Sequence, residues 1–354
     1  MRFNSGDGNV LDWLVGINRE HSRVFVEQQE ARRISRMMYP TEFAIFKCGD
    51  GRCDFTGMTE TVPGIFTPFR NIAARFSLRW PLFQRVVHDW KEYADSKGRH
   101  SVAVATYHYS RSAKQLGCAG HDCDFERARD CSLGLKKEFD DVYGGPESQG
   151  AATRLFTLQI GMETDLQALI LHGDDGQVVD LSEVTDCGEE EVRKLAISLW
   201  PKIYRPAPNV IRDMVPWLQG NIRHTQAVKK EHLPVEDLRH RESVIAYGRG
   251  YDWLHLRNTA VIVGPWESGS NPIQTAATLV SKNLEDGVID EPVLLTSGIY
   301  RKPGEERSLA ILKALGLRDI ALLVIEKEFP KLFEKIRILV TALDLNTREF
   351  DVIE

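Results

Sequence analysis

Apolar residues recur at helical spacing through the first forty residues, where Val10 and Leu14 fall on one face and Pro40 ends the pattern. A short apolar run at 43–48 follows, rich in residues that favour strands, and it leads into the glycine-bearing segment 49–52. The pattern predicts an N-terminal helical arm and then a buried strand that enters a tight loop.

The next part of the chain alternates between helical and strand patterns. Residues 81–97 predict an amphipathic helix, 101–108 predict a second strand, and 124–143 predict another helix. This alternation is typical of an α/β protein. Further strands are expected at 154–160, 166–172 and 178–181.

The last hundred residues repeat this order, which predicts a degenerate internal duplication. The stretch 189–248 is expected to be a mostly helical connector between the two halves. In the second half, segment 264–268 takes the place that 48–52 has in the first, and no cysteine follows Cys187, so we do not expect the same site there. The expected strands are 259–263, 292–296, 319–325, 336–342 and 347–353, and the expected helices are 272–284 and 304–315.

Composition and charge narrow the class of protein. The chain has 354 residues, of which 42% are hydrophobic and 27% are charged, as in globular proteins. A net charge of −6 argues against binding to nucleic acid or to an anionic membrane. No apolar run approaches the roughly 18 residues of a membrane span, and Met1–Gly6 lack the start of a secretory signal. We therefore expect a cytoplasmic protein that acts on a small molecule.

Four of the six cysteines form two clusters, Cys48 with Cys53 and Cys118 with Cys123, and His108 ends the strand between them. Two zinc sites are compatible with this pattern. All four thiolates could close a structural site, which leaves no position for a substrate. Alternatively, zinc could take Cys48, His108, Cys118 and a water molecule, as catalytic sites do. Spacing alone favours neither arrangement.

Asp50 and Arg52 follow Cys48 at two and four positions and favour the catalytic arrangement. A carboxylate beside zinc is drawn to bind the metal. An arginine fork can hold both carboxylate oxygens and leave the acid as an orienting hydrogen-bond acceptor. A closed structural site has no need of such a pair.

The pattern Cys48-x-Asp50-x-Arg52, with His108 at the end of a second strand and a later Cys118, resembles the β-class carbonic anhydrases. The ordinary His-x-x-Cys spacing is absent, because His108 and Cys118 are ten positions apart. This long gap is similar to the carboxysome shell branch of the class.

The resemblance implies an α/β fold with an N-terminal helical arm at 1–40 and a zinc-bearing catalytic domain at 41–235. A degenerate, metal-free domain of related fold would follow at 236–354. It further implies a zinc enzyme that interconverts carbon dioxide and bicarbonate by attack of zinc-bound hydroxide. Association into a homodimer or higher oligomer, and with a carboxysome, is also expected.

Within this implied site, Cys48, His108 and Cys118 hold zinc. Asp50 orients the attacking oxygen, and Arg52 keeps Asp50 off the metal. His121, near Cys118, is a candidate to shuttle the proton. Two alternatives stay open: a non-catalytic protein with a closed structural zinc, and a related zinc hydrolase that acts on carbon disulfide or carbonyl sulfide.

Overall fold

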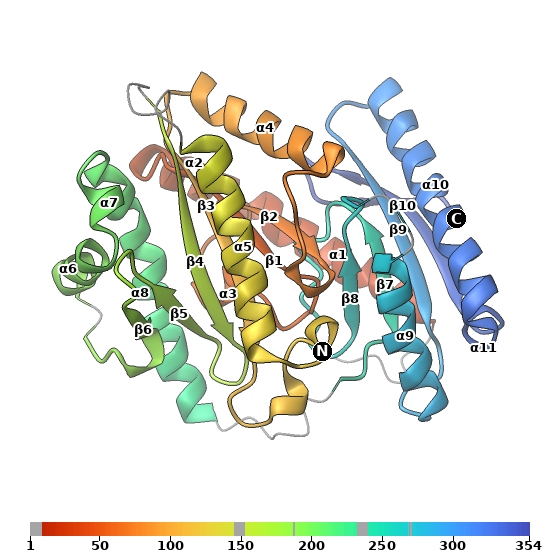
Figure 1. The fold of residues 1–354 in the computed structure, drawn as a ribbon. Helices are drawn as coiled ribbons and strands as arrows, with labels where there is room; N and C mark the ends of the chain where they lie inside the picture. Colours follow the sequence, from red (N-terminus) through yellow and green to blue (C-terminus); the bar gives the residue numbers. More distant parts are fainter. Residues whose placement is uncertain (1–8, 145–152, 187, 232–239, 268, 270) are drawn as a thin grey trace.

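Two β-sheets form the framework of the protein (Figure 1). The computed structural model describes residues 9–144, 153–186, 188–231, 240–267, 269 and 271–354. The first sheet has six strands in the order β2-β1-β3-β4-β5-β6, and the second has five in the order β11-β10-β9-β7-β8. The strands are β1 (Glu42–Cys48), β2 (Phe66–Asn71), β3 (Ser101–Tyr109), β4 (Leu155–Glu163), β5 (Ala168–His172), β6 (Val178–Asp180), β7 (Val244–Gly248), β8 (Ala260–Val263), β9 (Val293–Tyr300), β10 (Arg337–Asp344) and β11 (Phe350–Val352).

Helices cover both sheets and connect their parallel strands (Figure 1). Short 3-10 turns lie between several of them, and two of these, η2 (Lys114–Leu116) and η3 (Ala119–His121), flank Cys118. The α-helices are α1 (Val10–Glu27), α2 (Gln29–Met38), α3 (Phe55–Met58), α4 (Pro81–Ser96), α5 (Phe125–Tyr143), α6 (Glu189–Leu199), α7 (Pro201–Tyr204), α8 (Pro208–Glu231), α9 (Asn271–Glu285), α10 (Glu305–Glu328) and α11 (Pro330–Phe333).

The two sheets have the same topology, which confirms the α/β class and the duplication. In the first, β2, β1, β3 and β4 pair in parallel and β5 adds an antiparallel edge. In the second, β8, β7, β9 and β10 pair in parallel and β11 adds the antiparallel edge. Helices α4 and α5 follow β2 and β3, as α9 and α10 follow β8 and β9. Thus β7 is the counterpart of β1.

Three expectations about individual elements were wrong. The supposed connector 189–248 contains β7, whose short apolar run is fully buried but has no room to show a period. Residues 319–325 belong to α10, because an all-apolar run does not distinguish a strand from a helix. Strand β2 was missed because it carries Pro68, which is tolerated there since β2 is an edge strand.

The missed strand also changes which loops correspond. Segment 264–268 follows β8, the counterpart of β2, so its pairing with the Cys48 loop was wrong. Gly248 ends β7 as Cys48 ends β1. Neither cysteine nor histidine occurs after His255 in the sequence. The expectation that the second half does not rebuild the same set of ligands therefore holds with the corrected pairing.

Main-chain pairing joins the two halves at the end of β1. The Ile262 amide donates to the Gly49 carbonyl at 3.0 Å, and Asp50 forms an antiparallel bridge with Val261. The buried Arg70 guanidinium reinforces this joint by donating to four carbonyls at 2.8–3.2 Å, those of Gly49, Asp50, Tyr251 and Leu254. The loop that follows Cys48 is therefore held by residues of both halves.

The N-terminal helix α1 packs on the second half rather than on the sheet that follows it in sequence. Val10 and Leu14 are buried in the same apolar cluster as strands β7 and β9. The Asn18 side chain donates to the Arg348 carbonyl at 2.9 Å and accepts from the Phe350 amide at 2.8 Å. The chain thus crosses between halves before β1 begins, and the division at residues 40 and 235 stays a prediction.

Two expectations concern the relation to membranes and secretion. Met1–Gly6, on which the absence of a secretory signal was argued, lie outside the described residues. Across the described part of the chain, none of the helices combines the length and apolar character that crossing a bilayer requires.

The joint predicts an asymmetric response to glycine replacement. A Cβ at Gly49 would lie 1.9 Å from the Ile262 carbonyl oxygen, so Gly49→Ala must separate the halves locally. We expect a loss of about 2 kcal/mol or more in the free energy of unfolding, measured by urea denaturation. In Gly134→Ala, whose added Cβ meets no atom within 4 Å in exposed α5, we expect a gain of about 1 kcal/mol. Equal stabilities would contradict this account of the joint.

Candidate metal centre

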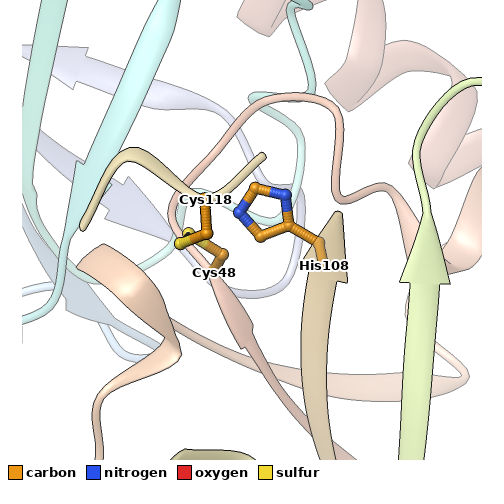
Figure 2. Close-up of side chains that lie close together, drawn as sticks. All are labelled: Cys48, His108 and Cys118. Carbon is orange, nitrogen blue, oxygen red and sulfur yellow. Dashed lines mark hydrogen bonds between the residues drawn. The ribbon is translucent and has the colours of Figure 1, made fainter. Parts of the chain in front are cut away.

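Three predicted ligands meet at one edge of the first sheet (Figure 2). Strands β1 and β3 are parallel neighbours, so their carboxyl ends lie side by side. Cys48 is the last residue of β1, His108 is the penultimate residue of β3, and Cys118 lies in the loop between η2 and η3. All three side chains are buried.

The distances suit one small metal ion. The Cys48 and Cys118 sulfurs are 3.9 Å apart, and one ligand atom from each of the three residues lies within 4.8 Å of the others. Both ring nitrogens of His108 are buried without a hydrogen-bond partner, which is costly for an imidazole unless something else binds it. Two sulfurs and one nitrogen are a typical donor set for Zn²⁺, and three protein ligands leave a fourth position open. The residues present therefore fit zinc.

The remaining clustered cysteines are placed differently. Cys53 is fully buried and approaches Cys48, but its sulfur is not within 4.8 Å of all three ligand atoms. The Cys123 sulfur is half-buried and donates to the Gln115 carbonyl at 3.3 Å. The structure thus groups Cys48 and Cys118 with His108 rather than with the two other cysteines, which favours the open arrangement.

Asp50 and Arg52 form a buried, bidentate ion pair beside these ligands. Arg52 Nη2 lies 2.6 Å from Asp50 Oδ2, and Arg52 Nε lies 3.0 Å from Oδ1. The Arg52 amide also donates to Oδ1 at 2.8 Å, and its Nη1 donates to the Leu116 carbonyl at 2.7 Å. The guanidinium is therefore fixed between the Cys48 loop and the Cys118 loop.

This pair keeps the carboxyl group ionised. Burial alone would raise the pKa of Asp50, but the charge and hydrogen bonds of Arg52 lower that pKa well below its ordinary value. The same geometry occupies acceptor sites on both carboxylate oxygens. Asp50 is thus a charged acceptor that Arg52 holds in place, as predicted for an orienting group.

Two residues that the sequence analysis did not single out reach the site from the second half. His240 and Glu242 precede β7, and their ligand atoms lie within 4.8 Å of one another and of an Asp50 oxygen. His240 Nδ1 contacts Glu242 Oε1 at 3.0 Å, whereas its buried Nε2 has no partner. Burial lowers the pKa of His240, but the hydrogen bond and charge of Glu242 outweigh this effect and raise it. No local pattern pointed to them, because only the joint between halves brings them to Asp50.

His121, the candidate shuttle, is less well placed. Its ring is buried and its Nε2 lies 2.8 Å from the Ala73 carbonyl oxygen. Burial also lowers the pKa of His121, which disfavours its charged form. A group engaged in this way is a poor carrier of protons to solvent.

The chain is similar to known proteins over part of its length. The family described as "Carboxysome Shell Carbonic Anhydrase, catalytic domain" matches residues 80–195. This segment includes His108 and Cys118, whereas Cys48, Asp50 and Arg52 precede it. The fold and site together thus define an α/β protein with a carbonic-anhydrase-like centre.

A curated relative points to the same branch. The carboxysome shell carbonic anhydrase of Prochlorococcus marinus (strain MIT 9313) is 28% identical over 182 residues, which are 47% of this chain. The chain spans only 34% of the length of that relative. These similarities confirm the predicted resemblance to the carboxysome shell branch.

The Asp50–Arg52 pair predicts a pH-dependent cost for removing one partner. Asp50 has a native pKa below its unfolded value, so the pair stabilises the native state above about pH 4 and loses this effect as the pH falls. In Arg52→Met, burial raises the pKa of Asp50, so stability should fall as the pH rises. We expect a loss of about 3–5 kcal/mol at pH 8 and a smaller loss at pH 5, measured by urea unfolding in chelator.

The double variant Asp50→Asn/Arg52→Met is the matched control. It removes both charges, so no buried carboxylate is left alone, and it should be more stable at pH 8 than Arg52→Met. If the single variant is as stable as the double variant at pH 8, the pair does not hold Asp50 as described.

Proposed function

We propose that the protein is a zinc-dependent carbonic anhydrase that interconverts carbon dioxide and bicarbonate. The observation that carries the proposal is the placement of an arginine-held carboxylate, Asp50, beside the cluster of Cys48, His108 and Cys118. The partial similarity to the carboxysome shell carbonic anhydrases supports the same reaction class.

Cys48, His108 and Cys118 would hold the zinc ion. When bound, zinc would supply Lewis acidity that lowers the pKa of a water molecule. A hydrogen bond with Cys118 lowers the pKa of the Cys48 thiol well below its ordinary value, so this residue is ready to act as a thiolate ligand. Two thiolates offset the charge of the ion, which makes an additional orienting group useful.

Asp50 is that group. A carboxylate offers about four acceptor sites, and Arg52 occupies them only in part, through its fork and its main-chain amide. An unoccupied site can accept a hydrogen bond from the attacking oxygen and direct a lone pair of that oxygen at the substrate carbon. Because Arg52 holds both carboxylate oxygens, Asp50 orients rather than binds the metal.

His240 is placed to take up the released proton. Its Nε2 faces Asp50 without another partner, while Glu242 holds Nδ1 and favours the protonated ring. His240 therefore replaces His121 as the shuttle in this proposal. The proposed catalytic group set then includes a residue from each half of the chain.

The cellular setting and the finer choice of substrate belong to the same proposal. The similarity to carboxysome shell enzymes supports association with a carboxysome and a location outside the membrane. Carbon disulfide and carbonyl sulfide are linear molecules with an electrophilic carbon, so a hydrolase for either is the second candidate. The buried site with its ionised carboxylate is shared by both reactions, and a direct comparison of substrates separates them.

Replacement of individual ligands tests the open zinc site. We expect about one zinc per chain in protein purified without added metal, and a loss of most of it in His108→Ala and in Cys118→Ser. Cys123→Ser and Cys53→Ser should retain zinc, because the cluster does not require their sulfurs. The measurement is metal content by mass spectrometry on folded protein. Zinc lost from the Cys53 and Cys123 variants but retained in His108→Ala would instead establish the closed structural site.

Stopped-flow hydration of carbon dioxide tests the reaction and the role of Asp50. The wild-type protein should show rapid hydration that a chelator abolishes. Asp50→Asn should bind zinc normally and lose about 100-fold or more in kcat, because the orienting charge acts on the reacting oxygen. The exposed Asp122→Asn is the control and should match the wild type. Full activity of Asp50→Asn would overturn its role, and zinc without hydration would overturn the proposed reaction.

A further inference from the structure

We infer that a second copy of this chain docks along the exposed face of helix α10, with the two helices antiparallel. Helix α10 lies on the outer side of the second sheet (Figure 1). Its inner face contacts β9 and β10. The inference concerns the outer face and does not depend on the proposed reaction.

The outer face carries a continuous apolar stripe. Leu309, Leu312, Ile320 and Leu323 are each 47–68% exposed. They recur at spacings that place them on one side of the helix and extend over about 21 Å. Scattered exposed leucines need no explanation, but four large ones aligned on one helix mark a surface that binds another protein. Because Ala310, Ala314, Ala321 and Ile325 are buried on the opposite side, the helix is apolar on two faces.

The stripe is symmetric about Gly316. Leu312 and Ile320 each lie four positions from this glycine, and Leu309 and Leu323 each lie seven positions from it. When two such helices cross antiparallel at Gly316, Leu312 of one faces Ile320 of the other, and Leu309 faces Leu323. An isologous contact requires this kind of self-complementary patch. A different partner protein would not require the symmetry.

The charges beside the stripe obey the same symmetry with opposite sign. Lys313 and Asp319 lie three positions on either side of Gly316, and Glu305 and Lys327 lie eleven positions on either side. In the antiparallel arrangement each lysine meets an acidic residue of the other copy. Among the described residues, Glu305, Lys313 and Lys327 form no ion pair within the chain. This complementarity identifies the second copy as the occupant.

Gly316 suits the crossing point itself. A helix-interior glycine costs about 1 kcal/mol relative to alanine, and here no atom lies within 4 Å of the position its Cβ would take. Nothing inside the chain therefore requires glycine at this site. The absence of a side chain allows a second helix to approach closely, since interaxial distance depends on the residues at the contact.

Sedimentation analysis of the full chain, loaded with zinc, tests the surface. We expect a dimer at micromolar concentration, and Leu312→Glu should raise its dissociation constant about 30-fold or more. Leu82→Glu is the matched control, because Leu82 is 47% exposed on α4 and lies outside the stripe. It should leave the dimer intact. A monomer at all concentrations, or a dimer that Leu312→Glu leaves unchanged, would overturn the inference.

Charge reversal tests the antiparallel register. Lys313→Glu places two acidic residues opposite each other and should weaken the dimer about 5-fold or more. Lys313→Glu/Asp319→Lys restores the complementarity across the two-fold axis and should recover wild-type affinity. Circular dichroism confirms that each variant is folded. Failure of the double variant to recover affinity would exclude this register.

Cross-linking locates the two-fold axis. In the antiparallel arrangement, residue 316 meets its own copy, whereas the two copies of residue 309 lie far apart. Gly316→Cys should therefore form a disulfide-linked dimer under mild oxidation, and Leu309→Cys should not. Cross-linking through position 309 alone would point to parallel helices and contradict the proposed arrangement.

Discussion

The main-chain pairing between the Cys48 loop and β8 is the constraint on which the site depends. The Gly49 carbonyl accepts from Ile262, and Asp50 pairs with Val261, so the loop acts as a short extra strand of the other half. Arg70 satisfies the carbonyls that this arrangement buries. Asp50 is therefore positioned by both sheets, and Arg52 need only turn its carboxylate. The site cannot form from the first half alone with the same geometry.

Much of the first half could be predicted from the sequence because its signals are local. The run at 43–48 has the length of a strand and ends at a glycine-bearing loop, and the helix at 81–97 has a clear apolar face. The proximity of Cys48 and His108 followed from strand ends, since adjacent parallel strands finish at one edge. Cys118 required the resemblance, because its loop has no periodic pattern.

The failures share a physical cause: they concern residues whose surroundings come from distant parts of the chain. Strand β7 is five buried residues, and only its neighbours β8 and β9 distinguish it from a helical turn. The apolar run 319–325 looked like a strand because α10 keeps leucines on its outer face. His240 meets Asp50 across the joint, about 190 positions away in sequence, where no spacing rule applies.

The joint also explains why the second half keeps its fold without keeping the ligands. Gly248 stands where β7 would need the counterpart of Cys48, so selection for metal binding no longer acts there. Selection on shape persists, because β8 holds the Cys48 loop and the segment before β7 delivers His240 and Glu242. A half that has lost its own chemistry thus remains part of the first site. Its outer helix α10 is under no such constraint and is free to carry an apolar face toward another molecule.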